Sequence, residues 1–426
     1  MKTLDNYIIN ITEPNTVLKI LDGDWTFAGE DTKYLTHGFH PYPARMMPLI
    51  AKKVIEVFAS REDDVVLDPF CGSGTVLVEA VVHDRNAMGF DINPLAVVIA
   101  KAKTTPIEPS KLREKIGKVI SDIVSDRSSY PPPKDIPNLY YWFKPQVVEA
   151  LAKILHHVKS LRDEDEALYN FFATAFSYTV WRVSNIKKGE YKLYRMPEEE
   201  LAKWNPDVIG TFREILLTNL KGMEEFYKAM QGKKARADVY LKDARESDLE
   251  ESVTLILTSP PYGDSRTTVA YGQFSRYSAL WLGLRDVLYV DEKSLGGIRR
   301  RGEVSKLESK TLEEVFNKIY ENYPERAWDL YSYFYDMDTA LERLAKALKR
   351  GRSHMVFVIG NRTVRRVQIP TDVILVEMAQ KYSFEHTKTI YRRIPTKRIP
   401  WKNAPENIPG LKGETISQEA IIIWRF

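Results

Sequence analysis

Residues 63–103 read DDVVLDPFCGSGTVLVEAVVHDRNAMGFDINPLAVVIAKAK, and this stretch decides the fold. Its pattern is typical of a strand, a glycine-rich loop, a helix, a second strand, an acidic turn and a second helix. Short β-branched runs before each turn indicate buried strands, and the longer apolar runs after them indicate helices. A strand, a helix and a second strand in this order form a βαβ unit, which predicts a parallel sheet.

Strand-like runs resume only after residue 235, in ADVYLKDARE, VTLILTSPPYG, HMVFVIGNR, FEHTKTIYRRIP and EAIIIWRF. The segment between has apolar residues at helical spacing, as in KPQVVEALAKILHHVKSL. We therefore expect an α/β fold with a mostly parallel, Rossmann-like sheet and a helical insertion between its second and third strands. The expected divisions are an N-terminal extension (1–35), a first sheet segment (36–105), a helical insertion that is a candidate for substrate recognition (106–235) and a second sheet segment with basic loops (236–426).

The composition is that of a globular protein with an ample core, since 44% of the 426 residues are apolar and 28% are charged. No run of 18 apolar residues predicts a membrane span, and the first residues lack the stages of a signal peptide. The single cysteine, Cys71, excludes an internal disulfide and fits a cytoplasmic location. Six glutamines against 120 charged side chains are typical of heat-adapted, thermophilic proteins.

The glycine-rich loop LDPFCGSGT lies between a strand and a helix, at 67–75. Gly72 and Gly74 allow a tight turn and a close approach of a ligand to the backbone. The loop lacks both the GxGxxG spacing of dinucleotide sites and the GK[ST] of phosphate loops. Asp68 ends the first strand, where it can hold an ammonium group, and Asp91 ends the second, where an acid accepts ribose hydroxyls. A ligand with an amino acid at one end and a ribose at the other is S-adenosylmethionine.

A second motif, TSPPYG at 258–263, follows an apolar strand. Pro260 ends that strand because it cannot donate a ladder hydrogen bond, and Pro261 holds Pro260 extended. The Ser259 hydroxyl and the Pro260 carbonyl then form two fixed acceptors, which suit the two hydrogens of an amine. Tyr262 places an aromatic ring beside them. We predict Ser259, Pro260, Pro261 and Tyr262 as the catalytic group.

These stretches resemble motifs of the S-adenosylmethionine-dependent amino-methyltransferases of nucleic acid. DPFCGSGT, FDINPLA and TSPPYGDSRTTVAYGQFSR resemble motifs I, II and IV, LKDARE resembles motif III, and HGFHPYPARMMP (37–48) resembles motif X. RRIPTKRIPWKNAPENIPG resembles a C-terminal stretch of cytosine-N4 DNA methylases. The resemblance covers about 37–105 and 236–426 and implies a class I methyltransferase fold. It also implies that the amine bound by Ser259 and Pro260 is the exocyclic amine of a base, and that Tyr262 stacks on a base drawn out of its helix.

The resemblance and the loop together imply a set of cofactor-binding residues, in which Asp243 is the partner of the adenine ring and the motif X segment completes the methionine side. The set is His37, Pro43, Asp68, Pro69, Phe70, Gly72, Gly74, Thr75, Asp91, Ile92, Asp243, Ala244 and Thr258.

The net charge is only +4, but cations gather in the last third of the chain, between glycines, prolines and aromatic residues. Such clusters suit phosphate contacts, so we expect nucleic acid as the partner. The predicted contacts are Arg266, Arg299, Arg300, Arg301, Arg365, Arg366, Arg392, Arg393, Lys397 and Arg398.

In the resembling family, serine at the first position of the SPPY motif accompanies cytosine-N4 methylation, and aspartate or asparagine accompanies adenine-N6 methylation. Ser259 therefore predicts cytosine-N4. Methylation of carbon 5 is excluded because it needs a cysteine nucleophile, and Cys71 lies inside the glycine loop. No metal site is expected, because His156 and His157 are adjacent on a helix and face different ways. DNA and structured RNA such as rRNA stay open as substrates, with an rRNA cytidine-N4 methyl- or dimethyltransferase, an adenine-N6 enzyme and a silent binding protein as alternatives. The target sequence, the number of methyl groups and the oligomeric state also stay open.

Overall fold

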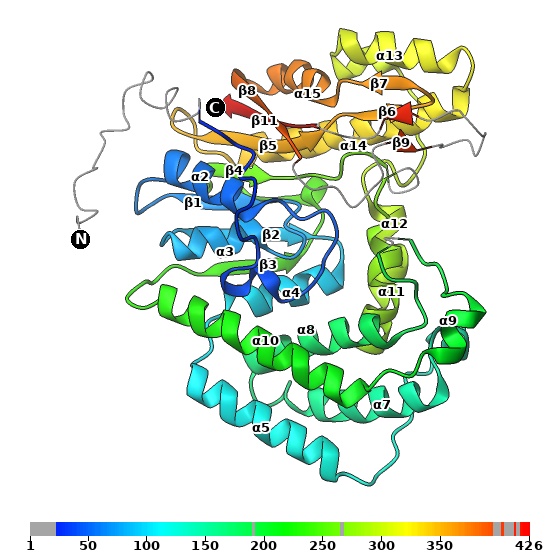
Figure 1. Ribbon diagram of the computed structural model, residues 1–426. Coiled ribbons are helices and arrows are strands. Elements are labelled where there is room, and N and C mark those ends of the chain that lie inside the picture. Colours follow the sequence, from blue (N-terminus) through cyan, green and yellow to red (C-terminus); the bar gives the residue numbers. More distant parts are fainter. Residues whose placement is uncertain (1–22, 190–191, 265–267, 395–401, 404–412, 415–417) are drawn as a thin grey trace.

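The computed structural model describes residues 23–189, 192–264, 268–394, 402–403, 413–414 and 418–426. In these residues seven strands form one sheet in the order β3-β2-β1-β4-β5-β11-β8 (Figure 1). The five strands from β3 to β5 are parallel to their neighbours, and β11 runs antiparallel to both β5 and β8. The strands are β1 (Val65–Asp68), β2 (Asn86–Asp91), β3 (Ala237–Leu241), β4 (Leu255–Thr258), β5 (His354–Gly360), β8 (Glu385–Arg393) and β11 (Gln418–Arg425).

Both faces of the sheet are covered, which is why its central strands are apolar on both sides. Along β4, Leu255 and Leu257 pack with α2 and α3, whereas Ile256 packs on the opposite face with α13, α14 and α15. This alternation follows from the two-residue period of a strand. The covering helices are α2 (Pro48–Phe58), α3 (Thr75–Val82), α13 (Lys310–Tyr320), α14 (Pro324–Ala347) and α15 (Thr371–Ala379).

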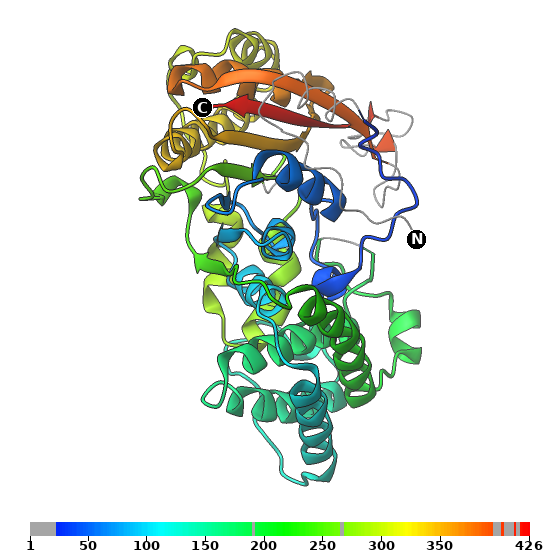
Figure 2. The ribbon, with the colours of Figure 1, turned by 90° about the vertical axis from the view of Figure 1, so that its left-hand side faces the viewer.

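A helical layer lies beyond the β3 edge of the sheet and is formed mainly by the chain between β2 and β3 (Figures 1 and 2). Its apolar stripe, including Val147, Leu151 and Val158, is buried in a core separate from the sheet's two cores. The mostly parallel α/β fold with an insertion between the second and third strands is therefore confirmed. The helices are α4 (Pro94–Thr104), α5 (Pro109–Ser125), α6 (Leu139–Trp142), α7 (Pro145–Ser160), α8 (Glu166–Val183), α9 (Glu198–Lys203) and α10 (Val208–Ala229).

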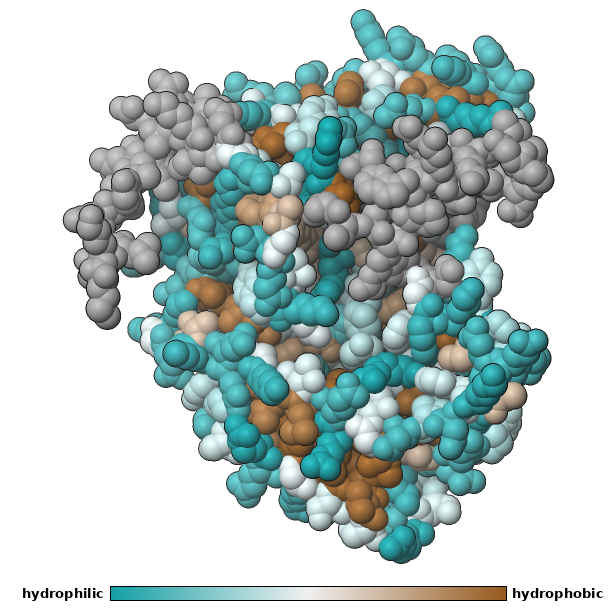
Figure 3. Space-filling view, in the orientation of Figure 1, coloured by the Kyte–Doolittle hydropathy of each residue, from teal (hydrophilic) through white to brown (hydrophobic). Residues whose placement is uncertain are grey.

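Two further helices, α11 (Tyr271–Trp281) and α12 (Val290–Lys293), lie between the sheet and this layer (Figure 1). On the face shown in Figure 3, hydrophilic residues predominate, and apolar residues reach the surface mainly over the insertion helices. Among the described residues, no helix is long and apolar enough to cross a membrane. The remaining elements are β6 (Arg362–Val364), β7 (Val367–Ile369), β9 (Lys402–Asn403), β10 (Gly413–Glu414) and the 3-10 helices η1 (Leu35–Gly38), η2 (Ala244–Glu246), η3 (Arg285–Tyr289), η4 (Val304–Leu307) and η5 (Gln380–Tyr382).

The strand order reverses direction between β1 and β4, since β2 and β3 lie on one side of β1 and β5 lies beyond β4. Parallel strands end at the same edge of a sheet, so Asp68, Asp91 and Thr258 come together there. In open α/β sheets a ligand crevice forms at the carboxyl ends of the strands where the order reverses.

Candidate active site

The glycine loop after β1 is held in one conformation by backbone hydrogen bonds. Gly72 and Gly74 have φ of 48° and 77°, in the left-handed region that favours glycine. A Cβ atom at Gly74 would lie 2.9 Å from the Cβ of Ala100 in α4. The Cys71 amide donates to the Phe90 carbonyl (2.9 Å), and buried Lys103 donates to the Ser73 carbonyl (2.8 Å). The loop is therefore fixed against β2 and α4 at the mouth of the crevice.

Asp91 connects this loop to the turn after β2. Its Oδ2 accepts from the Gly72 amide at 2.8 Å, and its Oδ1 accepts from the Asn93 amide at 2.7 Å. Burial raises the pKa of Asp91 to about 6. The hydrogen bonds from the two amides lower this pKa, whereas the nearby charge of Asp243 raises it. Each oxygen keeps a lone pair, so the carboxylate can still accept hydrogen bonds from a ligand.

Asp68 lies at the end of β1 and is 4% exposed. The Thr258 hydroxyl of β4 donates to its Oδ1 at 2.6 Å, and the Phe70 amide donates at 3.2 Å. Burial raises the pKa of Asp68 to about 7, because a charged carboxylate is poorly solvated there. A cationic group placed beside Asp68 would therefore stabilise its ionised form.

Around these acids the structure forms an open cleft, whose empty space of about 830 Å³ includes open solvent at its mouth. Most of the predicted site residues line it, namely Pro43, Asp68, Pro69, Phe70, Gly72, Thr75, Asp91, Ile92, Asp243, Ala244, Ser259 and Pro261. The predicted residues outside the lining are His37, Gly74, Thr258, Pro260 and Tyr262.

His37 is the clearest case of a predicted residue outside the lining. It is buried, and its Nε2 lies 2.8 Å from the Glu79 carboxylate. Burial lowers the pKa of His37 to about 4, so the ring is neutral near pH 7. Its carbonyl accepts a hydrogen bond from Arg45, which does line the cleft. His37 thus supports the cleft wall from behind.

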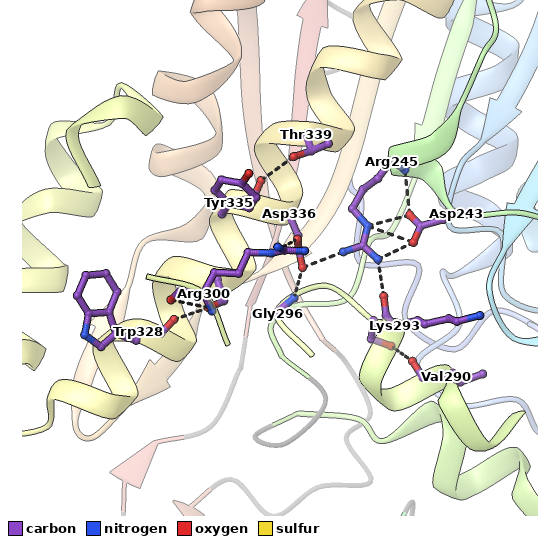
Figure 4. Close-up of polar contacts among 12 residues, drawn as sticks. Asp243, Arg245, Val290, Lys293, Gly296, Arg300, Trp328, Tyr335, Asp336 and Thr339 are labelled. Atoms are coloured by element: carbon purple, nitrogen blue, oxygen red, sulfur yellow. Dashed lines mark hydrogen bonds and ion pairs between the residues drawn. The ribbon is translucent and has the colours of Figure 1, made fainter. Parts of the chain in front are cut away.

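Asp243 is oriented by a partly buried ionic network, shown in Figure 4. The Arg245 guanidinium contacts both carboxylate oxygens of Asp243, at 2.9 and 2.5 Å, and also lies 2.9 Å from Asp336 of α14. Asp336 in turn accepts from the Gly296 amide (2.9 Å) and from Arg300 (3.3 Å). The cleft acid is therefore linked through three charged side chains to the basic loop that follows α12.

Ser259 and Pro261 of the Ser-Pro-Pro-Tyr motif, called the elbow below, form another part of the cleft wall. The Tyr333 hydroxyl of α14 donates to the Pro261 carbonyl at 2.7 Å. Ser259 Oγ donates to Tyr262 Oη at 3.3 Å, and Tyr262 Oη donates to Glu419 Oε1 at 3.0 Å. The motif is thus held by side chains from α14 and β11.

Several lining residues were missed by the sequence interpretation. Tyr42 and Tyr271 stack at 6.0 Å between ring centroids, and the Tyr42 hydroxyl accepts from Asn93. Tyr42 lies inside the motif X segment and Tyr271 inside the stretch that resembles motif IV, so the position of each was a usable signal. The missed residues are Tyr42, Ala44, Arg45, Met46, Cys71, Ser73, Asn93, Lys242, Arg245, Tyr271, Val290, Lys293, Ser294 and Leu295.

The predicted phosphate contacts fall into three groups. Arg299, Arg300 and Arg301 are exposed but pair with acids of α14, and the Arg300 guanidinium also lies over the Tyr335 ring at 5.1 Å. Arg366 and Arg393 are exposed, and Arg365 lies over the Tyr323 ring at 4.9 Å. Arg266, Lys397 and Arg398 lie outside the described residues.

Arg392 differs from this expectation, because the structure places it in the interior. Only 5% of it is exposed, and it donates to the carbonyls of Trp25 (2.8 Å) and Thr26 (3.2 Å) and pairs with Glu419. Its position on the inward face of β8 explains the difference from Arg393, since successive side chains of a strand point to opposite faces. Arg392 is therefore a structural cation and is not retained as a phosphate contact.

No cluster of three or more metal-ligating side chains occurs in the described part of the chain. The strand order, the glycine loop and the acids at three strand ends together define a Rossmann-like site of the class I methyltransferase type. Comparison with known proteins gives the family.

A family model described as “DNA methylase”, for N6 and N4 methyltransferases, matches residues 15–102. The Type II methyltransferase M.MvaI of Kocuria varians is 37% identical over 422 residues, which cover 93% of this chain and 92% of that protein. The Type II methyltransferase M.BsoBI of Geobacillus stearothermophilus is 21% identical over 319 residues, covering 67% and 59% of the two chains. The chain belongs to the N6/N4 DNA methylase family. It is therefore a methyltransferase of nucleic-acid amino groups, and membership implies S-adenosylmethionine as cofactor.

Among solved structures, the rRNA methyltransferase aviRa from Streptomyces viridochromogenes aligns over 90% of this chain and 87% of its own, with 9% identity and a TM-score of 0.31. This likeness is too distant to bear on function.

Proposed function

We propose that the protein transfers a methyl group from S-adenosylmethionine to the exocyclic N4 amine of cytosine in DNA. One observation carries the proposal. Ser259 and Pro261 line the same cleft as Asp68 and Asp91. The serine acceptor for an amine and the acids for the cofactor therefore face one shared space.

The residues present fit the proposed cofactor. Asp68 suits the ammonium of its amino-acid end, since burial leaves that carboxyl with a pKa of about 7 and a cation would stabilise the ionised form. Asp91 suits the ribose hydroxyls, and Asp243 suits the amino group of the adenine. Gly72 has no side chain that would keep the cofactor away from the backbone. A Cβ atom at this position would also crowd the Tyr42 ring, at 3.3 Å. When bound, the cofactor supplies a methyl group on a positively charged sulfur.

The elbow prepares the amine for attack. A cytosine amine is a weak nucleophile because its lone pair is delocalised into the ring. Hydrogen bonds from its two hydrogens to Ser259 Oγ and to the Pro260 carbonyl favour a pyramidal nitrogen with a more localised lone pair. The Tyr333 hydroxyl donates to the Pro261 carbonyl, which helps to fix the elbow. Fixed acceptors of this kind reduce reorganisation during the reaction.

Two observations support the choice of base and polymer. Ser259 occupies the position at which serine accompanies cytosine-N4 methylation in the resembling family. The full-length similarity to a Type II methyltransferase, M.MvaI, favours DNA over RNA. The similarity to a tRNA (guanine(10)-N2)-dimethyltransferase of Methanocaldococcus jannaschii covers only 28% of this chain. A match of that length cannot include both the insertion and the later strands, so it supports RNA less than the similarity to M.MvaI supports DNA.

The test is methylation of defined polymers by the purified protein, followed by mass spectrometry of the nucleosides. Mixed-sequence duplex DNA and total RNA are each incubated with S-adenosylmethionine labelled in its methyl group, with Ser259→Ala as the matched control. We expect labelled N4-methylcytosine from DNA. Labelled N6-methyladenine, or label in RNA alone, would overturn the assignment of base or polymer respectively.

A further inference from the structure

A continuous hydrogen-bond chain leads from the cleft to a carboxylate on β11. Ser259 Oγ donates to Tyr262 Oη at 3.3 Å, and Tyr262 Oη donates to Glu419 Oε1 at 3.0 Å. Glu419 lies 157 residues after Tyr262 in the sequence, and its side chain is 16% exposed. Tyr262 was expected to act by stacking through its ring. The structure shows that its hydroxyl is also hydrogen-bonded, to Ser259 on one side and to Glu419 on the other.

The far end of this chain is anchored by a buried cation. Glu419 Oε2 pairs with Arg392, whose guanidinium is also held by the carbonyls of Trp25 and Thr26. The second carboxylate oxygen, Oε1, therefore points back to Tyr262 with its charge balanced by Arg392. The role of buried Arg392 is therefore to hold Glu419 in place and to balance its charge.

The direction of the hydrogen bonds matters for the chemistry. Because Ser259 donates its own proton toward Tyr262, its oxygen presents lone pairs to the cleft and can accept from the substrate amine. Tyr262 is largely buried, and burial followed by the charge of Glu419 raises the pKa of its hydroxyl well above the usual value. The hydroxyl is therefore neutral and able to accept one proton while donating another. The ionisable groups acting on it are Glu419 and Tyr271.

We propose that Glu419 is the terminal acceptor of the proton released in methyl transfer, acting through Tyr262 and Ser259. This inference rests on the proposed function, because it requires an amine as the methyl acceptor. A new nitrogen–carbon bond forms as the sulfur–carbon bond breaks, and the electron pair of the broken bond stays on sulfur, which becomes neutral. The positive charge passes to the nitrogen, which must lose one proton.

That proton moves by three coupled transfers. The amine gives a proton to Ser259 Oγ, Ser259 gives its proton to Tyr262 Oη, and Tyr262 gives its proton to Glu419. Serine and tyrosine end neutral, and the carboxylic acid then releases the proton to water. Glu419 thus acts at a distance, without touching the base or the cofactor.

The decisive variant is Tyr262→Phe, which breaks the relay but keeps the ring face and leaves the Glu419–Arg392 pair intact. The matched control is Tyr277→Phe, which removes a tyrosine hydroxyl that bonds only weakly, at 3.4 Å, to the Pro137 carbonyl in the helical layer. The measurement is single-turnover methyl transfer at saturating cofactor in H₂O and in D₂O. We expect Tyr262→Phe to lower the rate by about 10²-fold, the lower end for a positioned proton-transfer group, and to change the solvent isotope effect. Tyr277→Phe should alter neither.

Glu419→Gln gives a second route, with thermal unfolding measured first because it leaves Arg392 unpaired. If Glu419→Gln folds, the double variant with Tyr262→Phe should be no slower than the slower single variant, since both break one relay. Additive losses would indicate two separate structural effects and overturn the proposal. A wild-type rate and isotope effect in Tyr262→Phe would also overturn it, whether or not Glu419→Gln folds. A failure of the proposed function would be seen in a different experiment, as label in another base or polymer with the wild-type protein. The ratio of variant to wild-type rates could still be measured on that substrate.

Discussion

The two walls of the cleft are built in different ways. On the cofactor side, Asp91 binds the amides of Gly72 and Asn93, which lie 19 and 2 residues away in the sequence. On the amine side, the elbow is held by Tyr333 and Glu419, which lie 72 and 157 residues from their partners. The contacts of Asp91 are therefore a local product of a βαβ unit, whereas the elbow depends on the completed fold.

This difference suggests a division of labour between the walls. The part of the cleft around Asp91, called the local wall below, can form its ligand contacts wherever the βαβ unit is intact. The elbow requires α14 and β11 to be in place, so its two acceptors are fixed only when the second half of the sheet is assembled. Changes at the elbow should therefore alter the rate of methyl transfer without altering cofactor affinity, and changes in the local wall should do the reverse.

The largest effect is expected for Ser259→Ala. Loss of one preorganised hydrogen-bonding partner should lower the single-turnover rate by roughly 10² to 10³-fold. Cofactor affinity, measured by calorimetry, should stay within about twofold of wild type, since Asp68, Asp91 and Asp243 are untouched. A variant with normal rate would remove the serine from the mechanism, and one with weakened cofactor binding would show that the walls are not independent.

The same difference explains what the sequence could and could not predict. The glycine loop, Asp68, Asp91 and the Ser-Pro-Pro-Tyr elbow were all predicted, because each lies at a strand end within a short recognisable pattern. Tyr333 and Glu419 were not, because nothing local to them signals a partner far away in the chain. Arg392 was assigned as a phosphate contact because a cluster of cations does not reveal which side chain of the strand points inward.

The next effect is expected on the cofactor wall. Asp91→Ala should weaken S-adenosylmethionine binding by about 1.5–3 kcal/mol, since the ribose hydroxyls lose an acceptor that carries charge. Asp91→Asn is the matched control, because its amide oxygen can still receive one of the two backbone donors. Unchanged affinity in Asp91→Ala would assign the ribose to another residue. The rate at saturating cofactor should change much less than in Ser259→Ala.

A smaller effect is a pH dependence on the same wall. Burial raises the pKa of Asp68 to about 7, so the folded protein without cofactor binds a proton there that the unfolded chain releases at lower pH. The raised pKa therefore stabilises the folded state fully at pH values below the pKa of the unfolded chain, near 4. This stabilisation is lost as the pH rises through about 7. Cofactor binding has the opposite sign, because the ammonium needs the ionised carboxylate.

The dissociation constant should therefore be constant above about pH 8 and rise by at most about tenfold per pH unit below 7. Calorimetric titrations between pH 6 and 8.5 measure this. Asp68→Asn should bind more weakly at pH 8 and lose most of the pH dependence, leaving the smaller contribution of Asp91, whose pKa is about 6. A wild-type affinity that is flat from pH 6 to 8.5 would place the ammonium away from Asp68.

The smallest effect concerns the predicted nucleic-acid face, at the hairpin of β6 and β7. Its two-residue turn is Arg365–Arg366, with φ of 47° and 68°. Such turns favour asparagine and glycine, and a residue with a Cβ atom is strained there by about 1–2 kcal/mol. Exposed Arg366 occupies a strained position at a tip, which is typical of a residue kept for function rather than for stability.

Arg366→Gly separates these two contributions. Removing the strain should raise the free energy of unfolding by about 1 kcal/mol, because glycine adopts positive φ readily, even after its greater entropy in the unfolded chain is counted. Removing one phosphate contact should lower the slope of log affinity against log salt by about 1. Arg366→Asn is the matched control, because it also tolerates the turn and removes the same charge, so its salt slope should match that of Arg366→Gly. Thermal unfolding and salt-dependent duplex binding measure the two quantities. A more stable Arg366→Gly protein with an unchanged salt slope would show that the strained arginine does not contact the phosphates, and would leave Arg299 to Arg301 and Arg393 as the described cations to test next.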